Sequence, residues 1–220
     1  IGIGSIPDAS LAALMDKNDL GFHSGMIAAG VRDLVKNGNM NGRQKAIDTG
    51  KHVTGVALGD IEFIDWAGND VDISFRPVSY THDTSVLRQI DNFVSINSAV
   101  EIDLFGQVNS EMLAGRQISG TGGAVDMMRG AALSRGGKSI VALNATAGGG
   151  RYSRIVAMLT PGNATTALRT DVDYIVTEFG ARRIRHLSLL DRAEALIEIS
   201  APQFRDQLRE VWRKRFFRLI

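Results

Sequence analysis

The chain has 220 residues, of which 44% are hydrophobic and 22% are charged, and its formal net charge at pH 7 is +1. These values are typical of a globular protein with a sizeable core, and the small charge gives no support to nucleic-acid binding. Cysteine is absent, which excludes disulfides, thiolate metal sites and a cysteine nucleophile. The histidines lack metal-ligand spacing, and no apolar run reaches the roughly 20 residues of a membrane helix. We therefore expect a cytoplasmic protein without a metal site, a membrane segment or a nucleic-acid partner.

In chain order, the first half alternates predicted helices with short predicted strands. The opening, IGIGSIPDA, reads as the end of a strand that enters a glycine loop and a helix, so we expect further sequence upstream. Apolar residues at helical spacing predict a helix over residues 26–37, with Gly38 at its end. The other predicted elements are strands at 19–23, 53–57 and 71–75, a loop at 39–49 and a helix at 60–67.

The central stretch, residues 93–135, combines a strand, an acidic pair, a glycine loop and a helix. The strand is expected at 93–96, and the acidic pair is Glu101 and Asp103. The glycine loop, residues 119–123 (SGTGG), leads directly into the helix. The apolar face of that helix is expected to consist of Val125, Met128, Ala132 and Leu133.

After the central stretch, the pattern of short apolar strands continues and then becomes helical. Strands are predicted at residues 138–143, 155–159 and 172–177, with a small-residue loop at 144–153. Helices are predicted at 189–199 and 204–219. Strands that alternate with helices predict an α/β architecture, with ligands bound at the loops that follow strand ends.

The glycine loop at residues 119–123 allows two interpretations. Backbone N–H groups beside the positive end of a helix dipole suit a phosphate, a carboxylate, or a thioester oxygen that becomes anionic during reaction. The same glycines also suit a sharp turn from a strand into a helix, with no ligand at all. The loop alone does not separate these interpretations.

Several segments taken together resemble the acetyl-CoA hydrolase/transferase family, which includes 4-hydroxybutyrate and succinyl-CoA:acetate CoA-transferases. The segments are GIGSIPDA, DLGFHSGMIAAGVRDLVKNG, SINSAVEIDLFGQVNSE, SGTGGAVDMMRGA, SRIVAMLTPGNATTALRTDVDYIVTEFGARRI and DRAEALIEISAPQFRDQLRE. They occur in the same order as in the family and cover most of the chain. The resemblance implies the second of two related domains, so that residues 1–220 form a C-terminal domain. Its implied fold is α/β, a CoA-transferase-type open sheet flanked by helices.

The resemblance also implies a chemistry and its partners. A glutamate attacks the acyl-CoA thioester and forms an acyl-glutamyl anhydride, then a glutamyl-CoA thioester that passes CoA to a carboxylic acid. The substrates are an acyl-CoA and a small carboxylic acid, and no cofactor is bound permanently. The N-terminal domain of the same protein and further copies of the chain are the expected protein partners.

The family's site residues can be matched to this sequence one by one. The implied oxyanion donors are the backbone N–H groups of Ile3 and Gly122, with Gly123 beside them. Asn97, which follows the central strand, is the implied partner of a bound carboxylate. The glutamate belongs in a pattern like H-T-E-M, but this sequence reads HSGM at residues 23–26. Gly25 therefore occupies the position of the nucleophile, and it has no side chain that could attack.

Other side chains have both a functional and a structural interpretation. Glu178 follows a predicted strand, where functional acids often lie, or it is a surface acid. Glu101 and Asp103 share a strand face, either for acid–base work or for bonds to their neighbours. Gly120 and Arg154 are candidates for contacts with CoA.

The sequence offers no clear replacement for the lost nucleophile. A Ser24–His23 pair lacks an acidic partner, and we expect packing or a hydrogen bond for His23 and helix capping for Ser24. The basic C-terminal tail either reaches the phosphates of CoA or forms the solvated face of an amphipathic helix.

Three functions follow from these observations. The first is an acyl-CoA transferase or hydrolase with altered or lost activity. The second is a non-catalytic CoA- or acyl-CoA-binding protein. The third is a sugar-phosphate or nucleotide binder that uses the glycine loop, which accounts for that loop but not for the other segments.

Overall fold

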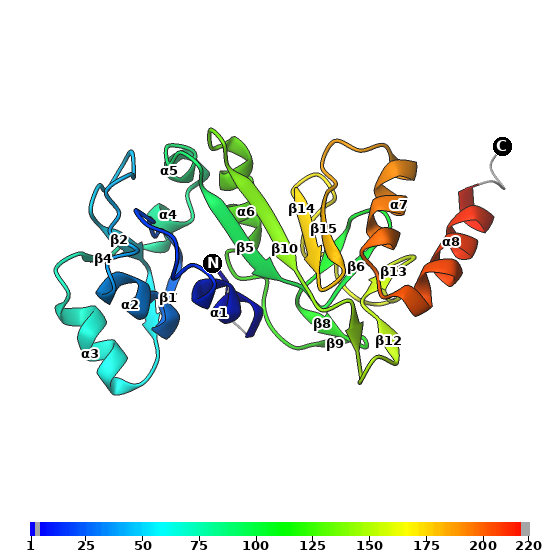
Figure 1. Cartoon of the computed structure of the whole chain (residues 1–220), viewed down its shortest axis with the longest axis horizontal. Helices are drawn as coiled ribbons and strands as arrows, with labels where there is room; N and C mark the ends of the chain where they lie inside the picture. Colours follow the sequence, from blue (N-terminus) through cyan, green and yellow to red (C-terminus); the bar gives the residue numbers. More distant parts are fainter. Residues whose placement is uncertain (3–4, 217–220) are drawn as a thin grey trace. The chain divides into compact units, whose positions relative to one another are not determined.

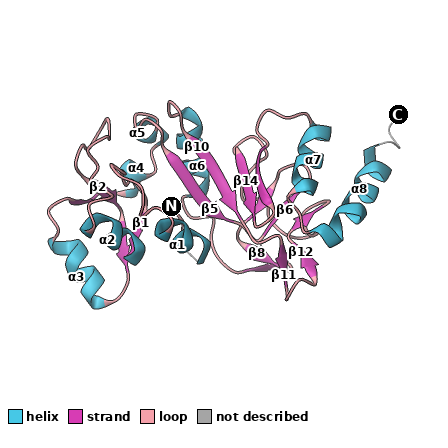
Figure 2. Ribbon diagram, viewed as in Figure 1, coloured by secondary structure: helices cyan, strands magenta, loops and turns pink. Residues whose placement is uncertain are grey.

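The chain folds into two units, and each contains short strands and helices (Figure 1 and Figure 2). The computed structural model describes residues 1–2 and 5–216. The first unit comprises Ile1–Ser95 with Asp126–Lys138, and the second comprises Ile96–Val125 with Ser139–Ile220. This mixture of open sheets and helices confirms the α/β class. Within the described ranges, no helix has both the length and the apolar character of a membrane span.

The strands of the first unit pair in parallel. β1 (Met26–Ala28) pairs with β3 (Val56–Leu58), and β2 (His52–Thr54) pairs with β4 (Ile73–Phe75). Parallel neighbours cannot be joined by a tight hairpin, so the chain between them must cross over, and here it does so through helices. Figure 1 shows these strands and helices in blue and cyan.

The crossover helices bury one side against the strands. α2 (Ala29–Lys36) follows β1, and α3 (Ile61–Asn69) follows β3. Asp60 caps α3, because its carboxylate accepts a hydrogen bond of 2.8 Å from the N–H of Phe63. One buried cluster joins these elements: Leu11, Phe22, Ile27, Val31, Leu34, Met40 and Phe63. Burying each large side chain of this kind contributes about 1.5–3 kcal/mol. The other helices of the unit are α1 (Ser5–Ala12), α4 (Val78–Thr81), α5 (Thr84–Leu87) and α6 (Ala124–Leu133).

The second unit contains a mixed four-stranded sheet with the order β15-β14-β10-β5. β10 and β14 are parallel, whereas β14 and β15 form an antiparallel pair. The strands of the unit are β5 (Val94–Ser98), β6 (Glu101–Asp103), β7 (Val108–Asn109), β8 (Met112–Leu113), β9 (Arg116–Gln117), β10 (Lys138–Ala142), β11 (Thr146–Ala147), β12 (Tyr152–Ser153), β13 (Ile155–Val156), β14 (Tyr174–Thr177) and β15 (Gly180–Arg183). Its helices are α7 (Leu189–Glu198) and α8 (Pro202–Phe216).

The structure corrects the predicted start of the helix at residues 26–37. Met26–Ala28 is instead the strand β1, because it pairs with β3, and the helix begins at Ala29. The strand predicted at 19–23 is reduced to isolated bridges at Leu20 and His23. Tertiary pairing decided the first outcome, since the local apolar pattern of residues 26–37 suits a helix over the whole segment.

Three further predictions need correction in the second unit and at α6. The strand predicted at 155–159 covers only Ile155–Val156, and the predicted loop at 144–153 contains the hairpin β11–β12. The strand β15 forms where the sequence pattern predicts no strand. The predicted face of α6 is wrong at Leu133, which is 59% exposed.

A glycine explains which face α6 turns to the core. Met127, Met128, Gly130 and Ala131 are its buried residues. A Cβ added to Gly130 would lie 2.5 Å from the Cβ of Leu87 in α5. Only glycine permits this approach, so α6 packs through Gly130 instead of through Leu133.

Gly130→Ala tests this packing. Alanine favours a helix over glycine by about 1 kcal/mol, but overpacking a buried site costs about 1–3 kcal/mol. We therefore expect a lower free energy of unfolding in urea denaturation of the full-length protein. Gly68→Ala in α3 is the matched control, since an added Cβ there meets nothing within 4 Å. The control should be at least as stable as the parent, and equal destabilisation by both changes would contradict the argument.

Candidate functional site

Residue 25 lies at a close approach of two chain segments in the first unit. Met26 faces Val56 and His23 faces Val53, the same 30-residue offset in both cases. Gly25 therefore stands opposite Gly55. The carbonyl oxygen of Gly25 accepts hydrogen bonds from the N–H groups of Gly55 at 3.1 Å and Val56 at 3.2 Å. A Cβ on Gly55 would lie 2.8 Å from this oxygen, so the two backbones come together only because residue 55 is glycine.

The imidazole of His82 occupies the space beside Gly25. A Cβ added to Gly25 would lie 2.4 Å from Cε1 and 2.7 Å from Nε2 of His82. His82 directly follows α4, and its Nδ1 lies 2.8 Å from the hydroxyl oxygen of Thr81. This hydrogen bond resists rotation of the ring. The space where a side chain at residue 25 would begin is therefore filled by the nitrogen-bearing edge of a half-buried histidine.

A second histidine is buried in the same unit. His23 is 5% exposed, and its Nε2 lies 3.2 Å from the carbonyl oxygen of Thr81. Because a carbonyl only accepts, Nε2 carries the hydrogen and Nδ1 is the lone-pair nitrogen. Within the described part of the chain, Nδ1 has no hydrogen-bond partner. Burial, reinforced by the charge of Lys45, lowers the pKa of His23 to about 4, so the ring is neutral near pH 7.

A buried lysine joins the two chain segments that lead into this region. Lys45 is 6% exposed, and its Nζ donates to the carbonyl oxygens of Phe22 at 3.2 Å and Lys51 at 2.8 Å. Burial lowers the pKa of Lys45 to about 8, against the opposing effect of Asp48. Phe22 precedes the HSGM segment and Lys51 precedes β2, so this one ammonium group fixes both. Burial also lowers the pKa of His52, again with a contribution from Lys45.

The structure decides between the interpretations of His23 and Ser24. The packing and hydrogen bonding expected of His23 are confirmed. The capping role expected of Ser24 is wrong, because α2 has Ala28 at its N-terminal cap and no side-chain hydrogen bond there. The hydroxyl of Ser24 instead donates to the carbonyl oxygen of Ile1 at 3.3 Å. His23 and Ser24 therefore bond to different partners and form no nucleophile–base pair.

The glycine loop lies immediately before α6, as the sequence predicted. Gly120 and Gly122 are exposed and Gly123 is half-buried. Gly122 has a φ of +53°, a conformation that favours glycine, and an added Cβ there meets nothing within 4 Å. Ile3, the other implied oxyanion donor, lies outside the described residues. The oxyanion role of these backbone groups therefore stays a prediction.

Asn97 lies inside a strand and not after one. The strand predicted at residues 93–96 is β5, which continues to Ser98 and therefore contains Asn97. Its side chain is half-buried. Its implied role as the partner of a carboxylate stays a prediction.

The acidic pair Glu101 and Asp103 is structural. Glu101 is 7% exposed, and its carboxylate accepts from Thr160 Oγ1 at 2.8 Å and from Asn163 Nδ2 at 2.7 Å. Asp103 is 1% exposed and accepts from both the backbone and the side-chain nitrogen of Gln107, at 2.9 and 2.7 Å. These bonds fix the turn after β6 and the loop at residues 160–163. The acid–base interpretation of the pair finds no support.

Glu178 and Arg154 also have partners in the second unit. Oε2 of Glu178 accepts a hydrogen bond of 2.8 Å from the N–H of Ala145. Glu178 lies in the turn between β14 and β15, and its side chain is exposed. The guanidinium of Arg154 lies 3.5 Å from the carbonyl oxygen of Ala99, a long contact. Their roles at the reacting group and at CoA stay predictions.

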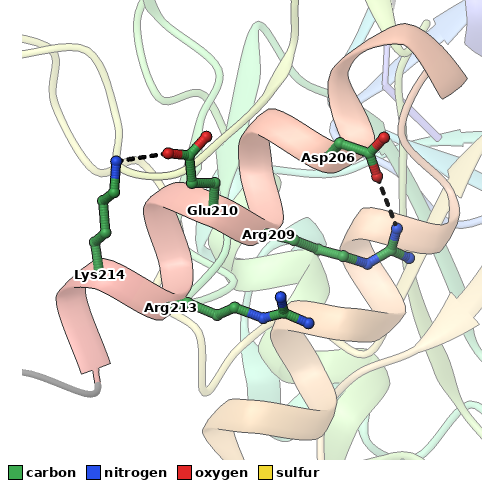
Figure 3. Close-up of a pocket in the computed structure, with 5 residues that line it drawn as sticks. All are labelled: Asp206, Arg209, Glu210, Arg213 and Lys214. Atoms are coloured by element: carbon green, nitrogen blue, oxygen red, sulfur yellow. Dashed lines mark hydrogen bonds and ion pairs between the residues drawn. The ribbon is translucent and has the colours of Figure 1, made fainter.

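A hollow of about 430 Å³ on the C-terminal helix α8 is lined by three cationic and two anionic side chains: Asp206, Arg209, Glu210, Arg213 and Lys214 (Figure 3). Lys214 pairs with Glu210 at 2.6 Å, and Arg209 lies 3.6 Å from Asp206. Such exposed pairs contribute little to stability, typically about 0–1 kcal/mol. Because all its lining residues come from one helix and their charges are largely compensated, the hollow is a solvated face.

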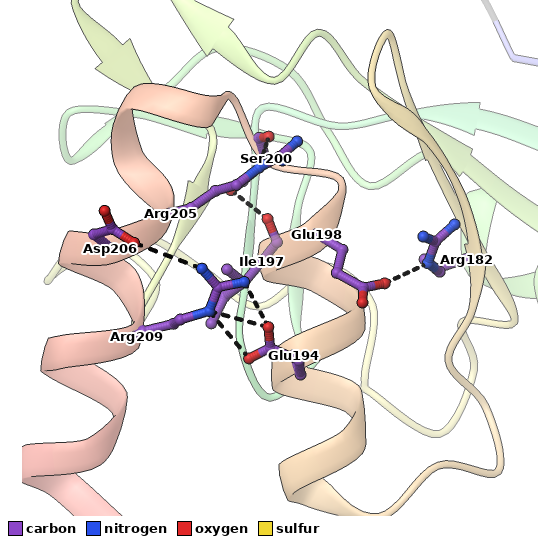
Figure 4. Close-up of polar contacts among 8 residues, drawn as sticks. All are labelled: Arg182, Glu194, Ile197, Glu198, Ser200, Arg205, Asp206 and Arg209. Atoms are coloured by element: carbon purple, nitrogen blue, oxygen red, sulfur yellow. Dashed lines mark hydrogen bonds and ion pairs between the residues drawn. The ribbon is translucent and has the colours of Figure 1, made fainter.

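The opposite side of α8 packs on its own unit, which confirms the amphipathic helix. Leu208 and Trp212 are buried, and the rings of Trp212 and Phe105 lie 5.2 Å apart. Arg209 bridges to α7 through Glu194 at 2.6 Å, as Figure 4 shows. The tail is therefore fixed by an apolar face and one interhelical ion pair.

A family model for the acetyl-CoA hydrolase/transferase C-terminal domain matches residues 59–212. The chain belongs to this acetyl-CoA hydrolase/transferase family. A 4-hydroxybutyrate coenzyme A transferase of Clostridium kluyveri is 46% identical over 98% of the chain and 50% of its own length. A butyryl-CoA:acetate CoA-transferase of Anaerostipes caccae is 40% identical over 97% of the chain, again with 50% of its own length. The chain thus spans about half the length of the curated relatives it matches.

Two solved structures have the same fold as the chain. The crystal structure of RipA from Yersinia pestis matches 100% of the chain and 49% of that protein, with a TM-score of 0.93 and 40% identity. A 4-hydroxybutyrate CoA-transferase from Porphyromonas gingivalis matches 98% of the chain and 50% of that protein, with a TM-score of 0.85 and 41% identity. The CoA-transferase-type fold is therefore confirmed.

Sequence reasoning missed two residues at this family's candidate site. His82 was considered only as a possible metal ligand, because nothing in the local pattern connects it to Gly25, which lies 57 positions earlier. Lys45 falls in a segment whose polarity predicts a solvated loop, yet it is buried. Within the described ranges, no group of three or more potential ligand side chains could hold a metal ion.

Gly25→Ala tests the contact with His82. The added methyl overlaps the ring, and moving the ring breaks the bond to Thr81, so we expect a loss of about 1–2 kcal/mol in the free energy of unfolding. His82→Ala should remove most of this cost when the two changes are combined. A double-mutant cycle measured by urea denaturation gives the coupling. Additive effects of the two changes would contradict the contact.

The buried neutral His23 predicts a pH-dependent stability. The pKa of His23 falls from 6.5 to about 4 in the folded chain, so between these values the unfolded chain binds more protons. Stability is therefore fully present above about pH 6.5 and is lost as the pH falls toward 4, by up to about 3 kcal/mol.

His23→Gln should reduce this loss, because glutamine stays neutral and can still donate to the carbonyl of Thr81. Urea unfolding at pH 7 and pH 4.5 measures the difference. His186→Gln, at an exposed histidine, is the control and should keep the parental pH dependence. If the two variants respond alike, burial of His23 is not the cause.

Proposed function

We propose that the chain is the C-terminal half of an enzyme that cleaves small acyl-CoA thioesters without a glutamyl intermediate at residue 25. Family membership supports the substrate class, since relatives carry the names of transferases for 4-hydroxybutyryl, butyryl and succinyl groups and of an acetyl-CoA hydrolase. The observation that carries the proposal is the imidazole of His82, whose edge fills the space beside Gly25. An acyl-glutamyl group cannot form at a residue without a side chain.

Loss of the nucleophile affects transfer more than hydrolysis. Transfer between a thioester and a carboxylic acid depends on a covalent intermediate that stores the activated acyl group. Hydrolysis needs only water, a proton acceptor and hydrogen-bond donors for the oxyanion. Backbone N–H groups of the glycine loop at residues 119–123 are the donors we assign to this role. Glu178, Asn97, Gly120 and Arg154 remain candidates for contacts with the acyl or CoA group.

A second candidate function is a CoA- or acyl-CoA-binding protein without catalysis. The absence of a side chain at residue 25 favours it, because that position supplies the attacking group in the mechanism that the family resemblance implies. Under this alternative the protein binds acyl-CoA and releases it unchanged. An N-terminal half of the same protein and self-association belong to both proposals.

Incubation with acetyl-CoA and borohydride separates these functions, because borohydride reduces and traps a glutamyl-CoA thioester. We expect no modification of the full-length protein, together with slow release of CoA thiol that does not depend on added acetate. Gly25→Glu combined with His82→Ala is the informative variant, since removal of the ring frees the space for a carboxylate. This variant should gain the borohydride-sensitive adduct if the remaining site is intact.

Other outcomes of the experiment have clear meanings. Acetate-dependent CoA exchange with an adduct on the parent protein would contradict the proposal and reveal another nucleophile. CoA binding without thiol release would favour the non-catalytic alternative. Absence of both binding and release would remove acyl-CoA from consideration.

A further inference from the structure

We propose that the imidazole of His82 replaces the missing carboxylate beside Gly25 and acts as the general base that activates water for thioester hydrolysis. This inference rests on the proposed function, to which it adds the group that accepts the proton. The starting observation is geometric: Nε2 lies 2.7 Å from the position where a side chain at residue 25 would begin. Nε2 of His82 thus lies next to the position from which the glutamate implied by the family resemblance would extend.

The ring is held in one orientation. Nδ1 lies 2.8 Å from Oγ1 of Thr81. Thr81 is itself completely buried, and its carbonyl oxygen is bonded to Nε2 of His23 at 3.2 Å. The support for His82 is therefore a buried threonine fixed by a buried neutral histidine. Held groups of this kind contribute more to catalysis than mobile ones, because less ordering is needed at the moment of reaction.

The other nitrogen of His82 is available for chemistry. Among the residues that the structure describes, Nε2 has no hydrogen-bond partner, and the residue is half-buried. When Nδ1–H donates to the Thr81 hydroxyl, Nε2 carries the lone pair that a general base requires. Histidine is the side chain that most often serves as a general base in enzymes.

Neighbouring groups cannot take this role. Nε2 of His23 donates to Thr81, and its Nδ1 is fully buried. The hydroxyl of Ser24 donates to Ile1. Lys45 donates to two carbonyl oxygens and is 6% exposed. Of these basic side chains, His82 is the one that is partly exposed and has a lone pair, on Nε2, that can accept a proton from water.

The proposed step balances without a further reactant. Nε2 of His82 takes a proton from water while the water oxygen bonds to the thioester carbon and the carbonyl oxygen becomes an oxyanion. The carbon–sulfur bond then breaks, and the thiolate of CoA takes the proton back from Nε2. The products are the free carboxylic acid and CoA thiol. General-base assistance of this type is worth about 10²- to 10⁴-fold in rate.

The test uses the full-length protein with acetyl-CoA and butyryl-CoA, and CoA release is followed with a thiol reagent. His82→Gln keeps a polar side chain but cannot act as a base, so kcat should fall by about 10²- to 10⁴-fold while KM changes little. His82→Ala should lose activity similarly and regain at least about tenfold with added imidazole, which fits the space beside Gly25. His186→Gln should leave both constants unchanged, since His186 is exposed.

Thr81→Val separates positioning from packing. Valine keeps the shape of threonine but removes the bond to Nδ1, so kcat should fall by about tenfold. The same change in the His82→Ala background should have no further effect on kcat, because Thr81 acts through the ring. Thermal unfolding of each variant identifies any that has lost its fold, and His82→Gln serves in place of His82→Ala if that variant unfolds.

Each outcome decides one question. Parental kcat in His82→Gln, or a loss in His82→Ala that imidazole does not restore, overturns the role of His82 while hydrolysis itself stands. A parent protein that binds CoA but releases no thiol overturns the role of His82 and favours the non-catalytic alternative. A parent that neither binds CoA nor cleaves thioesters overturns the proposed function itself.

Discussion

The close approach of Gly25 and Gly55 is the constraint on which the candidate site depends. The Gly25 carbonyl accepts two backbone hydrogen bonds across this point, which keep the parallel register unbroken between His23 and Met26. A side chain at residue 55 would collide with that carbonyl. Because the register is fixed, the side of residue 25 that would bear a Cβ faces His82 and no other described group within 3.6 Å. With the ring of His82 in this position, residue 25 has no room for a side chain.

The electrostatics of the first unit keep the region rigid and its buried histidine neutral. Lys45 satisfies two carbonyl groups and places its charge close enough to oppose protonation of His23. In its neutral form, His23 donates from Nε2 to the carbonyl oxygen of Thr81, and its buried Nδ1 carries no proton. The hydroxyl of Thr81 in turn is hydrogen-bonded to Nδ1 of the half-buried His82. Desolvation disfavours the charged form of His23 and keeps its ring neutral. The neutral ring then takes part in the hydrogen bonds that run from His23 through Thr81 to His82.

In the second unit, carboxylates serve the architecture. Glu101 and Asp103 are buried, but hydrogen-bond donors surround them and fix loops that contain little regular structure. Such networks satisfy the polar groups that are buried together with these loops. The carboxylates of Glu101 and Asp103 are therefore committed to hydrogen bonds within their own unit.

The sequence by itself determined the family, the α/β class, the main helices near residues 61, 189 and 202, and the glycine at position 25, because each is a property of local pattern or of aligned segments. Only the tertiary structure decided that residues 26–28 form a strand, since pairing with β3 overrides a helical pattern. It also decided which face of α6 is buried, through the contact of Gly130 with Leu87. The meeting of His82 with Gly25 could not be read from the chain, because no local spacing connects residues so far apart in sequence.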